Sequence, residues 1–328
     1  MLRPLPGLLA TLLAVSVVHC ASAEVRDTFD DAEDGGSATT SSGAPSEPSG
    51  PPAIDSDSGV TDGGSQVCTE DIDVVLVIDT SSSMNFVLQA LEEEFVNVVQ
   101  ASNALKQGAH FGAVFFQDNA LLDVSGDEEG GKVHLGHESL VSAFSTMRTV
   151  YTRNNRNPGD GPTGPSTQNP ICEENSLDAL HLAATDFPWR ENAARVAVVV
   201  TDDTFLEADD NYGDRDGDGD TTSTSYPREG DYPAQFTLAQ TVTALQTAGV
   251  KVFSFTQAGA SFECGTGRRH DSGDSVTYGW SAPYEGQAPI PEQTGGKNYD
   301  LAEIRSGSLH LDEAINGIVL ETRCNGVN

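Results

Sequence analysis

The chain has 328 residues, and 50 acidic side chains against 17 basic ones give it a formal net charge of −33. This balance argues against binding to a nucleic-acid backbone or adsorption to an anionic membrane, because both need clustered Lys and Arg. The length fits one large domain or two small ones, and such acidity favours solubility and the recruitment of cations.

The first 23 residues have the pattern of a secretory signal peptide. Arg3 supplies the positive start, Leu8–Val18 the short apolar core and Ala21–Ala23 the small-residue cleavage site. The apolar core is too short to span a bilayer, and no later run is long enough either. Cleavage before Cys20, followed by lipid attachment there, is the alternative. The protein is therefore expected to be secreted or attached to the cell surface.

Residues 24–66 form an acidic stretch rich in Ser, Gly and Pro, with few large apolar side chains. Such a segment cannot bury enough surface to offset its chain entropy, so we expect a disordered linker. It is either a leash between the cell envelope and a folded head or a plain secreted linker. The ordered domain is expected over residues 67–328.

Short β-branched apolar runs alternate with stretches of helical periodicity over residues 67–328, interrupted by insertions at about 203–232 and 257–296. This alternation predicts an α/β fold with a doubly wound, mostly parallel sheet flanked by helices. The expected strands are 74–78, 109–116, 121–124, 195–200, 250–256 and 299–304. The expected helices are 84–107, 139–147, 173–187, 234–248 and 309–323.

The most informative stretch is the first strand and the polar turn that follows it. The run Val74–Ile78 reads as a strand buried on both faces, and it ends at Asp79, with Ser81 and Ser83 close behind. A parallel strand that runs into a helix delivers these residues to the carboxyl edge of the sheet, where open α/β folds bind ligands. Carboxylate and hydroxyl oxygens are hard ligands that suit Mg²⁺, Mn²⁺ or Ca²⁺.

The D-x-S-x-S pattern of Asp79, Ser81 and Ser83 resembles the metal-ion-dependent adhesion site of the von Willebrand factor type A domain. The resemblance covers residues 67–328 apart from the two insertions and implies a Rossmann-like fold. It also implies a third metal loop after the fourth core strand, which matches Asp202 in VAVVVTDD. Taken singly, the serines could cap the next helix and Asp202 could be a solvated loop acid. Taken together, they favour a metal site.

The second metal loop departs from the commonest pattern of that family, which has a Thr five residues before an Ala-Leu pair. Counting back from Ala179–Leu180 gives Glu174, as in the integrin β-subunit variant. With Asp79 and Asp202, Glu174 would bring three negative charges to one divalent ion. Binding an acidic ligand then requires at least one carboxylate to be held away from the ion. Glu173, Ser176 and Thr167 are alternatives in the same region.

Four cysteines remain beyond residue 23, which in an exported protein predicts two disulfides. Cys68 precedes the first strand and Cys324 ends the last helix, so both should lie at the amino edge of the sheet. Cys172 and Cys264 should lie at the carboxyl edge. The expected pairs are therefore Cys68–Cys324 and Cys172–Cys264.

The first insertion carries alternating acids, Asp214, Asp216, Asp218 and Asp220, with Gly219 at the sixth position of an EF-hand-like loop. Ser225 stands where the loop should end in Glu, so the segment is either a Ca²⁺ site or a mobile acidic loop. Repulsion between clustered carboxylates favours Ca²⁺.

In the second insertion, Tyr278, Trp280 and Tyr284 alternate with small residues. They are either anchors of a binding surface beside the metal or side chains that pack the loop onto its own domain.

The resemblance implies a non-enzymatic adhesion domain, in which a protein ligand presents an Asp or Glu to a metal-bound edge of the sheet. The alternatives are a calcium-stabilised structural domain and a metal-dependent hydrolase. The sequence contains no G-x-S-x-G, D-x-D-x-T or HExxH motif, and its histidines are scattered. We therefore expect no enzymatic activity. The expected partner is a protein, with no nucleic acid and no transmembrane segment.

Overall fold

The computed structural model describes residues 71–103, 108–164, 173–208, 234–257 and 276–325. Every described residue belongs to the unit Thr61–Asn328, which is described by itself. The expected signal peptide, Cys20 and the linker lie outside the described residues.

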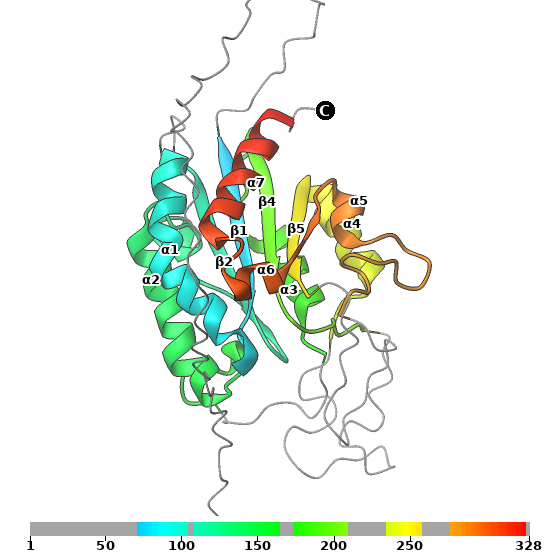
Figure 1. Cartoon of the computed structure of the whole chain (residues 1–328), viewed down its shortest axis with the longest axis horizontal. Coiled ribbons are helices and arrows are strands. Elements are labelled where there is room, and N and C mark those ends of the chain that lie inside the picture. Colours follow the sequence, from blue (N-terminus) through cyan, green and yellow to red (C-terminus); the bar gives the residue numbers. More distant parts are fainter. Residues whose placement is uncertain (1–70, 104–107, 165–172, 209–233, 258–275, 326–328) are drawn as a thin grey trace, which may run out of the picture. The chain divides into compact units, whose positions relative to one another are not determined.

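In the part of the domain that the structure describes, there are six strands and seven α-helices (Figure 1). The strands are β1 (Ile72–Asp79), β2 (His110–Phe116), β3 (Ala120–Leu122), β4 (Ala194–Val200), β5 (Val250–Thr256) and β6 (Asn298–Asp300). The helices are α1 (Asn85–Asn103), α2 (His137–Thr146), α3 (Ser176–Asp186), α4 (Leu238–Ala248), α5 (Ile290–Thr294), α6 (Leu301–Ser306) and α7 (Leu311–Asn325). A π-helical turn, Met147–Tyr151, extends α2, and short 3₁₀ turns span Ser82–Met84, Glu129–Gly131, Thr152–Asn154 and Pro158–Asp160.

The strands form one sheet in the order β3-β2-β1-β4-β5-β6, in which every pair is parallel except β2 with β3. The chain builds outward from β1 through β2 to β3, then crosses to the other side of β1 and continues through β4. The carboxyl ends of β1 and β4 therefore flank the point where the strand order reverses. In open α/β sheets this switch point is where ligands bind. The expected doubly wound α/β fold is confirmed.

The sheet is buried on both faces, as the unbroken apolar run in β1 predicts. Val74, Leu76 and Ile78 point into one hydrophobic cluster, and Val75 and Val77 into the other. The first cluster includes side chains of α1, α2 and α7, which pack together in Figure 1, and the second includes α3 and α4. Two helical layers therefore cover the sheet and leave its carboxyl edge as the place where polar side chains gather.

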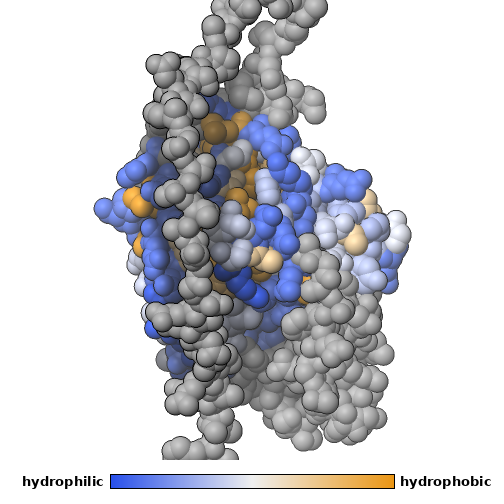
Figure 2. All heavy atoms as spheres, in the orientation of Figure 1, coloured by the Kyte–Doolittle hydropathy of each residue, from blue (hydrophilic) through white to orange (hydrophobic). Residues whose placement is uncertain are grey.

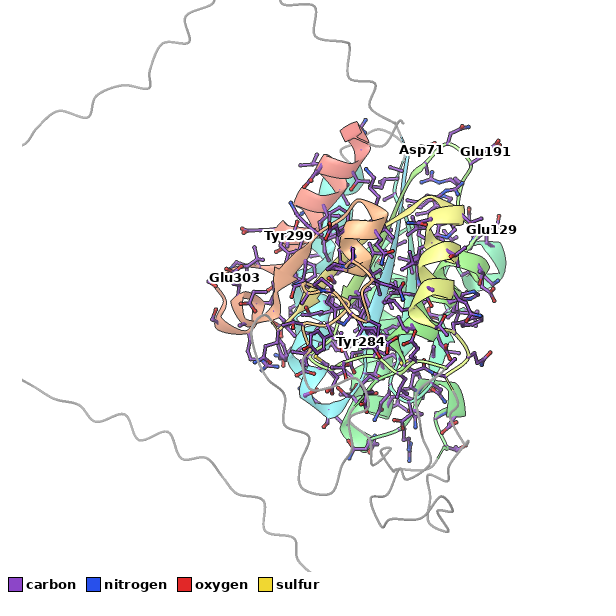
Figure 3. All side chains as sticks on the ribbon, turned by 90° about the vertical axis from the view of Figure 1, so that its right-hand side faces the viewer. Asp71, Glu129, Glu191, Tyr284, Tyr299 and Glu303 are labelled. Carbon is purple, nitrogen blue, oxygen red and sulfur yellow. The ribbon has the colours of Figure 1, made fainter. Side chains whose placement is uncertain are left out.

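An ion pair between Arg190 and Asp73 lies at the amino edge of the sheet. Arg190, before β4, donates from its backbone N–H and from Nε to the carboxylate of Asp73 in β1, at 2.7 and 2.6 Å. Asp73 is completely buried, whereas Arg190 keeps a quarter of its side-chain surface exposed. Asp71 and Glu191 lie together at this end of the domain in Figure 3.

Most expected elements are present, with shifted ends. The expected strand at 299–304 is wrong beyond Asp300, because the Asp300 carboxylate accepts the Ala302 N–H at 2.9 Å and begins α6. Gly108, expected to adopt a left-handed cap conformation after the first helix, has φ of +68°.

Few of the large apolar side chains among the described residues are exposed. Hydrophilic residues cover much of the face shown in Figure 2, and three large apolar side chains, Val124, Leu135 and Leu320, are exposed. Within the described ranges, no helix is both long and apolar enough to cross a bilayer.

Candidate metal centre

The loop after β1 is held in place by hydrogen bonds to its neighbours. The backbone N–H and the hydroxyl of Thr80 both donate to the Phe116 carbonyl at the end of β2, at 2.8 and 2.9 Å. Asp79 is fully buried and accepts the Ser81 N–H and the Thr201 hydroxyl, each at 2.7 Å. The loop is thereby fixed to both strands that adjoin β1.

A chain of hydrogen bonds links this loop to the end of β4. The hydroxyl oxygens of Ser81 and Ser83 lie 3.0 Å apart, and Ser83 donates to Oδ1 of Asp202 at 2.8 Å. The second oxygen of Asp202 accepts Nη2 of Arg305, in α6, at 3.0 Å. The Arg305 guanidinium also lies 4.7 Å from the centre of the Phe86 ring. Ser81, Ser83 and Asp202 thus share one polar cluster, and the Arg305 guanidinium beside it is not indicated by any local sequence pattern.

Glu174 reaches the same edge from the loop that precedes α3. Its N–H donates to the Thr204 carbonyl, and its own carbonyl accepts the Leu206 N–H, both at 3.0 Å. The next N–H, of Asn175, donates to the Gln117 carbonyl at 2.7 Å. Glu174 is therefore clamped between the loops that follow β4 and β2.

The Glu174 side chain is buried, and its Oε2 has no hydrogen-bond partner among the described residues. Burial raises the pKa of Glu174 well above the usual value, and the negative charges of Asp79, Asp118, Asp203 and Asp202 add to the effect. Burial likewise raises the pKa of Asp79 from 3.8 to about 7, with a further contribution from Asp202. An unsatisfied carboxylate oxygen among several acids is an arrangement that a cation would stabilise.

The acids at this edge do not form a closed ligand set. Where the chain is described, the one group of three His, Cys, Asp or Glu residues with ligand atoms all within 4.8 Å of one another is Glu94, His310 and Asp312. That group joins α1 to the start of α7 and includes none of the residues singled out by the sequence. At the carboxyl edge, the carboxylates would have to move closer or bind an ion through water. The serine hydroxyls would complete such a set.

Of the alternatives to Glu174, Glu173 is buried, Ser176 is buried with an unpartnered hydroxyl, and Thr167 lies outside the described residues. For Glu174, the nearby charge of Asp79 adds to the effect of burial in raising the pKa.

Several sequence predictions fall outside the described ranges. These are the acidic loop with Asp214, Asp216, Asp218 and Asp220, and three of the four cysteines, Cys68, Cys172 and Cys264. Cys324 belongs to α7, and its pairing with Cys68 is not described.

The aromatic residues of the second insertion pack inward. Trp280 and Tyr284 are buried, and their rings lie 6.2 and 5.0 Å from that of Phe205, in edge-to-face contacts. Tyr278 is half-buried, with its ring 6.4 Å from that of Tyr284. Of the two readings of this cluster, packing onto its own domain is the one the structure favours.

The sequence reasoning missed Asp118 and Arg305. Asp118 lies two residues after the end of β2, and Asp79 is the last residue of β1, so the place of Asp118 at the end of a buried strand is a usable signal. Arg305 reaches Asp202 from a helix 103 residues further along the chain, and no local pattern announces such a contact.

The fold is a doubly wound α/β sheet, consistent with a Rossmann-like von Willebrand A fold, and acids and hydroxyls lie at the switch point of this sheet. Neither a scan against protein-family models nor a search of curated proteins gives a match. Similar solved structures include an aerotolerance-related membrane protein from Bacteroides fragilis, carrying multiple mutations to serine, with 13% identity and a TM-score of 0.39. That alignment covers 78% of this chain and all of the other.

Proximal thread matrix protein 1 of the mussel byssus is also similar, with 11% identity and a TM-score of 0.39. The alignment covers 78% of this chain and 49% of the matrix protein, so this chain spans about half the length of that structure.

Proposed function

We propose that this protein is a secreted or surface-tethered, non-enzymatic binding domain. It would engage a protein ligand through a divalent ion held by Asp79, Ser81, Ser83, Glu174 and Asp202. The observation that carries the proposal is the meeting of three loops at the switch point of the sheet, with a buried Glu174 oxygen that lacks a hydrogen-bond partner among the described residues.

The donor set fits a hard cation. All five side chains offer oxygen, which suits Mg²⁺, Mn²⁺ or Ca²⁺ rather than a metal that prefers sulfur or nitrogen. Asp79 and Glu174 are buried acids with raised pKa values, so they have most to gain from a positive charge. The bound ion would supply one coordination position for a carboxylate oxygen from the ligand.

Arg305 supports an acidic ligand. Three carboxylates would over-neutralise a divalent ion, and the contact between Arg305 and Asp202 offsets part of that charge. About half of the Arg305 side chain is exposed, so its guanidinium stands at the rim of the site. An incoming Asp or Glu would meet this cation as well as the ion.

A pull-down from the native surroundings tests the proposal. Wild-type protein and Asp79→Ala are compared in Mg²⁺ and in excess EDTA, with circular dichroism to verify that the variant is folded. We expect a partner that is captured in Mg²⁺, released by EDTA and not captured by the variant. Glu93→Ala, at an exposed position of α1, is the control and should capture the partner normally. Capture that persists in excess EDTA would exclude the metal bridge.

Turnover assays test the non-enzymatic part of the proposal. Phosphate and ester substrates are offered with and without Mg²⁺, and no activity above background is expected. Metal-dependent turnover that Asp79→Ala abolishes would identify a hydrolase instead.

A further inference from the structure

Arg305 holds one of the proposed metal ligands, Asp202, from a distant part of the chain. Its Nη2 donates to Oδ2 of Asp202 at 3.0 Å, and the Ser83 hydroxyl donates to the other carboxylate oxygen at 2.8 Å. Both oxygens of Asp202 therefore have protein donors. The guanidinium also lies 4.7 Å from the centre of the Phe86 ring, so it contacts both the loop after β4 and the start of α1.

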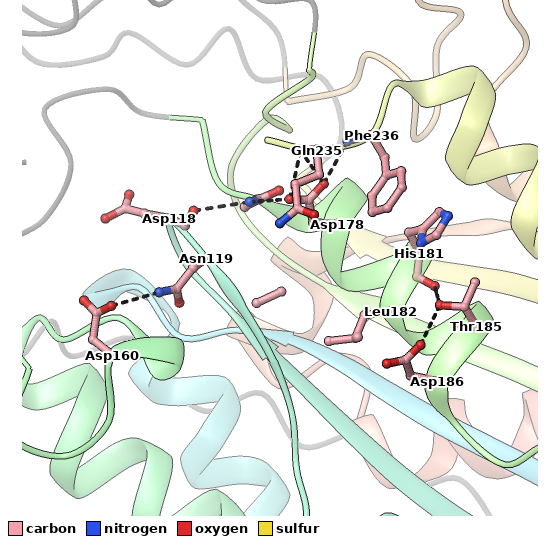
Figure 4. A pocket seen from close by; sticks show the side chains of 12 residues that line it. Asp118, Asn119, Asp160, Asp178, His181, Leu182, Thr185, Asp186, Gln235 and Phe236 are labelled. Atoms are coloured by element: carbon pink, nitrogen blue, oxygen red, sulfur yellow. Dashed lines mark hydrogen bonds between the residues drawn. The ribbon is translucent and has the colours of Figure 1, made fainter. Parts of the chain in front are cut away.

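The negative charge near Arg305 extends beyond Asp202. Burial is the largest cause of the raised pKa values of Asp79 and Glu174, and the charge of Asp202 adds to both. The cavity next to Glu174, which Asn175 helps to line, has four aspartates in its wall and no Lys or Arg among its described lining residues (Figure 4). Arg305 therefore brings positive charge to an edge of the sheet where acids predominate.

Because the guanidinium occupies a carboxylate that a divalent ion would need, we propose that Arg305 competes with the metal for Asp202. It holds Asp202 while no ion is bound and releases this carboxylate when an ion binds. The inference rests on the proposed metal site. A guanidinium and a divalent ion at one carboxylate repel each other, and an oxygen bound to the ion is a poorer acceptor for Arg305. Arg305 therefore lowers the affinity of the protein for the metal.

The released side chain remains at the rim of the site. About half of its surface is exposed, and its backbone is fixed in α6. A guanidinium with free donors binds a carboxylate through two parallel N–H···O bonds. Metal binding thus frees the group that receives the acidic side chain of a ligand, and this couples ligand binding to the presence of the ion.

The simpler alternative is a structural ion pair that does not oppose the metal, and Lys297 provides a matched comparison for it. Its Nζ pairs with Glu321 at 2.8 Å and lies 5.2 Å from the centre of the Tyr299 ring. The Lys297 side chain is 48% exposed, against 49% for Arg305. Lys297 precedes β6, which runs parallel to β5, so it lies at the amino edge of the sheet, opposite the proposed metal site.

The test is calorimetric titration of EDTA-stripped protein with Mn²⁺ at pH 7.5 and 150 mM salt, in the wild type, Arg305→Gln and Lys297→Gln. Each substitution removes one positive charge and one partly exposed ion pair, so general attraction of cations is matched. We expect Arg305→Gln to bind Mn²⁺ about fivefold more tightly than the wild type, and Lys297→Gln to bind it with wild-type affinity. A purely structural role of Arg305 predicts unchanged or weaker binding. Should Arg305→Gln fail to fold, Arg305→Met, whose unbranched side chain can keep the contact with Phe86, replaces it with the same expectation.

Thermal unfolding adds a second measurement. In EDTA, Arg305→Gln should melt below the wild type, because Asp202 loses its counter-ion, and this gap should narrow or reverse in saturating Mn²⁺. The gap between Lys297→Gln and the wild type should be the same in both conditions. Equal or weaker Mn²⁺ binding in Arg305→Gln, or an equal gain in Lys297→Gln, would overturn the role of Arg305 and leave the metal site in place. No saturable Mn²⁺ binding in any of the three proteins would instead overturn the metal site, and this inference with it.

Discussion

The buried carboxylate of Asp79 leads to an unusual prediction: Asp79→Asn should stabilise the protein when no metal is supplied. Burial and the charge of Asp202 raise the Asp79 pKa from 3.8 to about 7, so above pH 7 the folded protein carries an ionised group in an unfavourable place. The asparagine side chain has nearly the same shape and no charge. Its oxygen can accept the Ser81 N–H, and its amide can donate to the Thr201 hydroxyl.

The size of the effect follows from the pKa. A rise from 3.8 to about 7 corresponds to about 4 kcal/mol at pH 8, and imperfect replacement of one hydrogen bond would remove about 1 kcal/mol of the gain. The net gain of about 3 kcal/mol predicts a rise in melting temperature of roughly 6–12 °C for a domain of this size.

Thermal unfolding in EDTA at pH 8, and again in Mg²⁺, measures this effect. A bound ion at 100 times its dissociation constant would stabilise the wild type by about 2.7 kcal/mol and leave the variant unchanged, so the gap should narrow or close. A wild type that melts above Asp79→Asn in EDTA would refute the reasoning, because the carboxylate would then be well stabilised without a cation.

Three further predictions concern stability. In EDTA, the wild type should lose stability as pH rises from 4 to 7, because Asp79 and Glu174 keep their protons in the folded state after the unfolded chain has released them. Melting temperatures that rise across this range would contradict the raised pKa values. Asp73→Ala should lower the free energy of unfolding in urea by about 3 kcal/mol, since it removes the buried carboxylate that pairs with Arg190 and leaves only the more exposed Asp71, at 3.6 Å. A loss below 1 kcal/mol would show that Asp71 and water replace the pair. Gly112→Ala should cost about 1–3 kcal/mol by the same assay, because its Cβ would lie 2.4 Å from a Phe187 ring carbon, and unchanged stability would mean that the ring moves freely aside.

The sequence predicts the sheet well because β1 is buried on both faces. The apolar run Val74–Ile78 indicates a strand buried on both faces, and a strand there places Asp79 at the carboxyl edge of the sheet wherever the helices pack. Glu174 was found by counting residues from the helix that follows it, and the structure places it beside the loops after β2 and β4.

Contacts between distant parts of the chain were beyond the reach of such patterns. Arg305 reaches Asp202 only because α6 begins at Asp300, where a side-chain cap ends the expected strand. No local pattern indicates that the side-chain oxygen of Asn175 lacks a hydrogen-bond partner among the described residues, because this depends on the contact of its amide nitrogen with Asp178. The sequence does not show whether Trp280 and Tyr284 are exposed or buried, because their burial depends on contacts with Phe205, which comes from a distant part of the chain.

The most direct measurement of the central claim is a calorimetric titration of EDTA-stripped protein with Mn²⁺ or Mg²⁺, in wild type, Glu174→Gln and the exposed control Glu93→Gln. Both substitutions remove one negative charge, so general attraction of cations is matched. We expect a saturable site in the wild type and in Glu93→Gln that is lost or weakened at least tenfold in Glu174→Gln, since the unpartnered buried oxygen would be a ligand. Metal binding of equal strength in all three proteins, or no saturable binding in any, would contradict a divalent ion at this edge of the sheet.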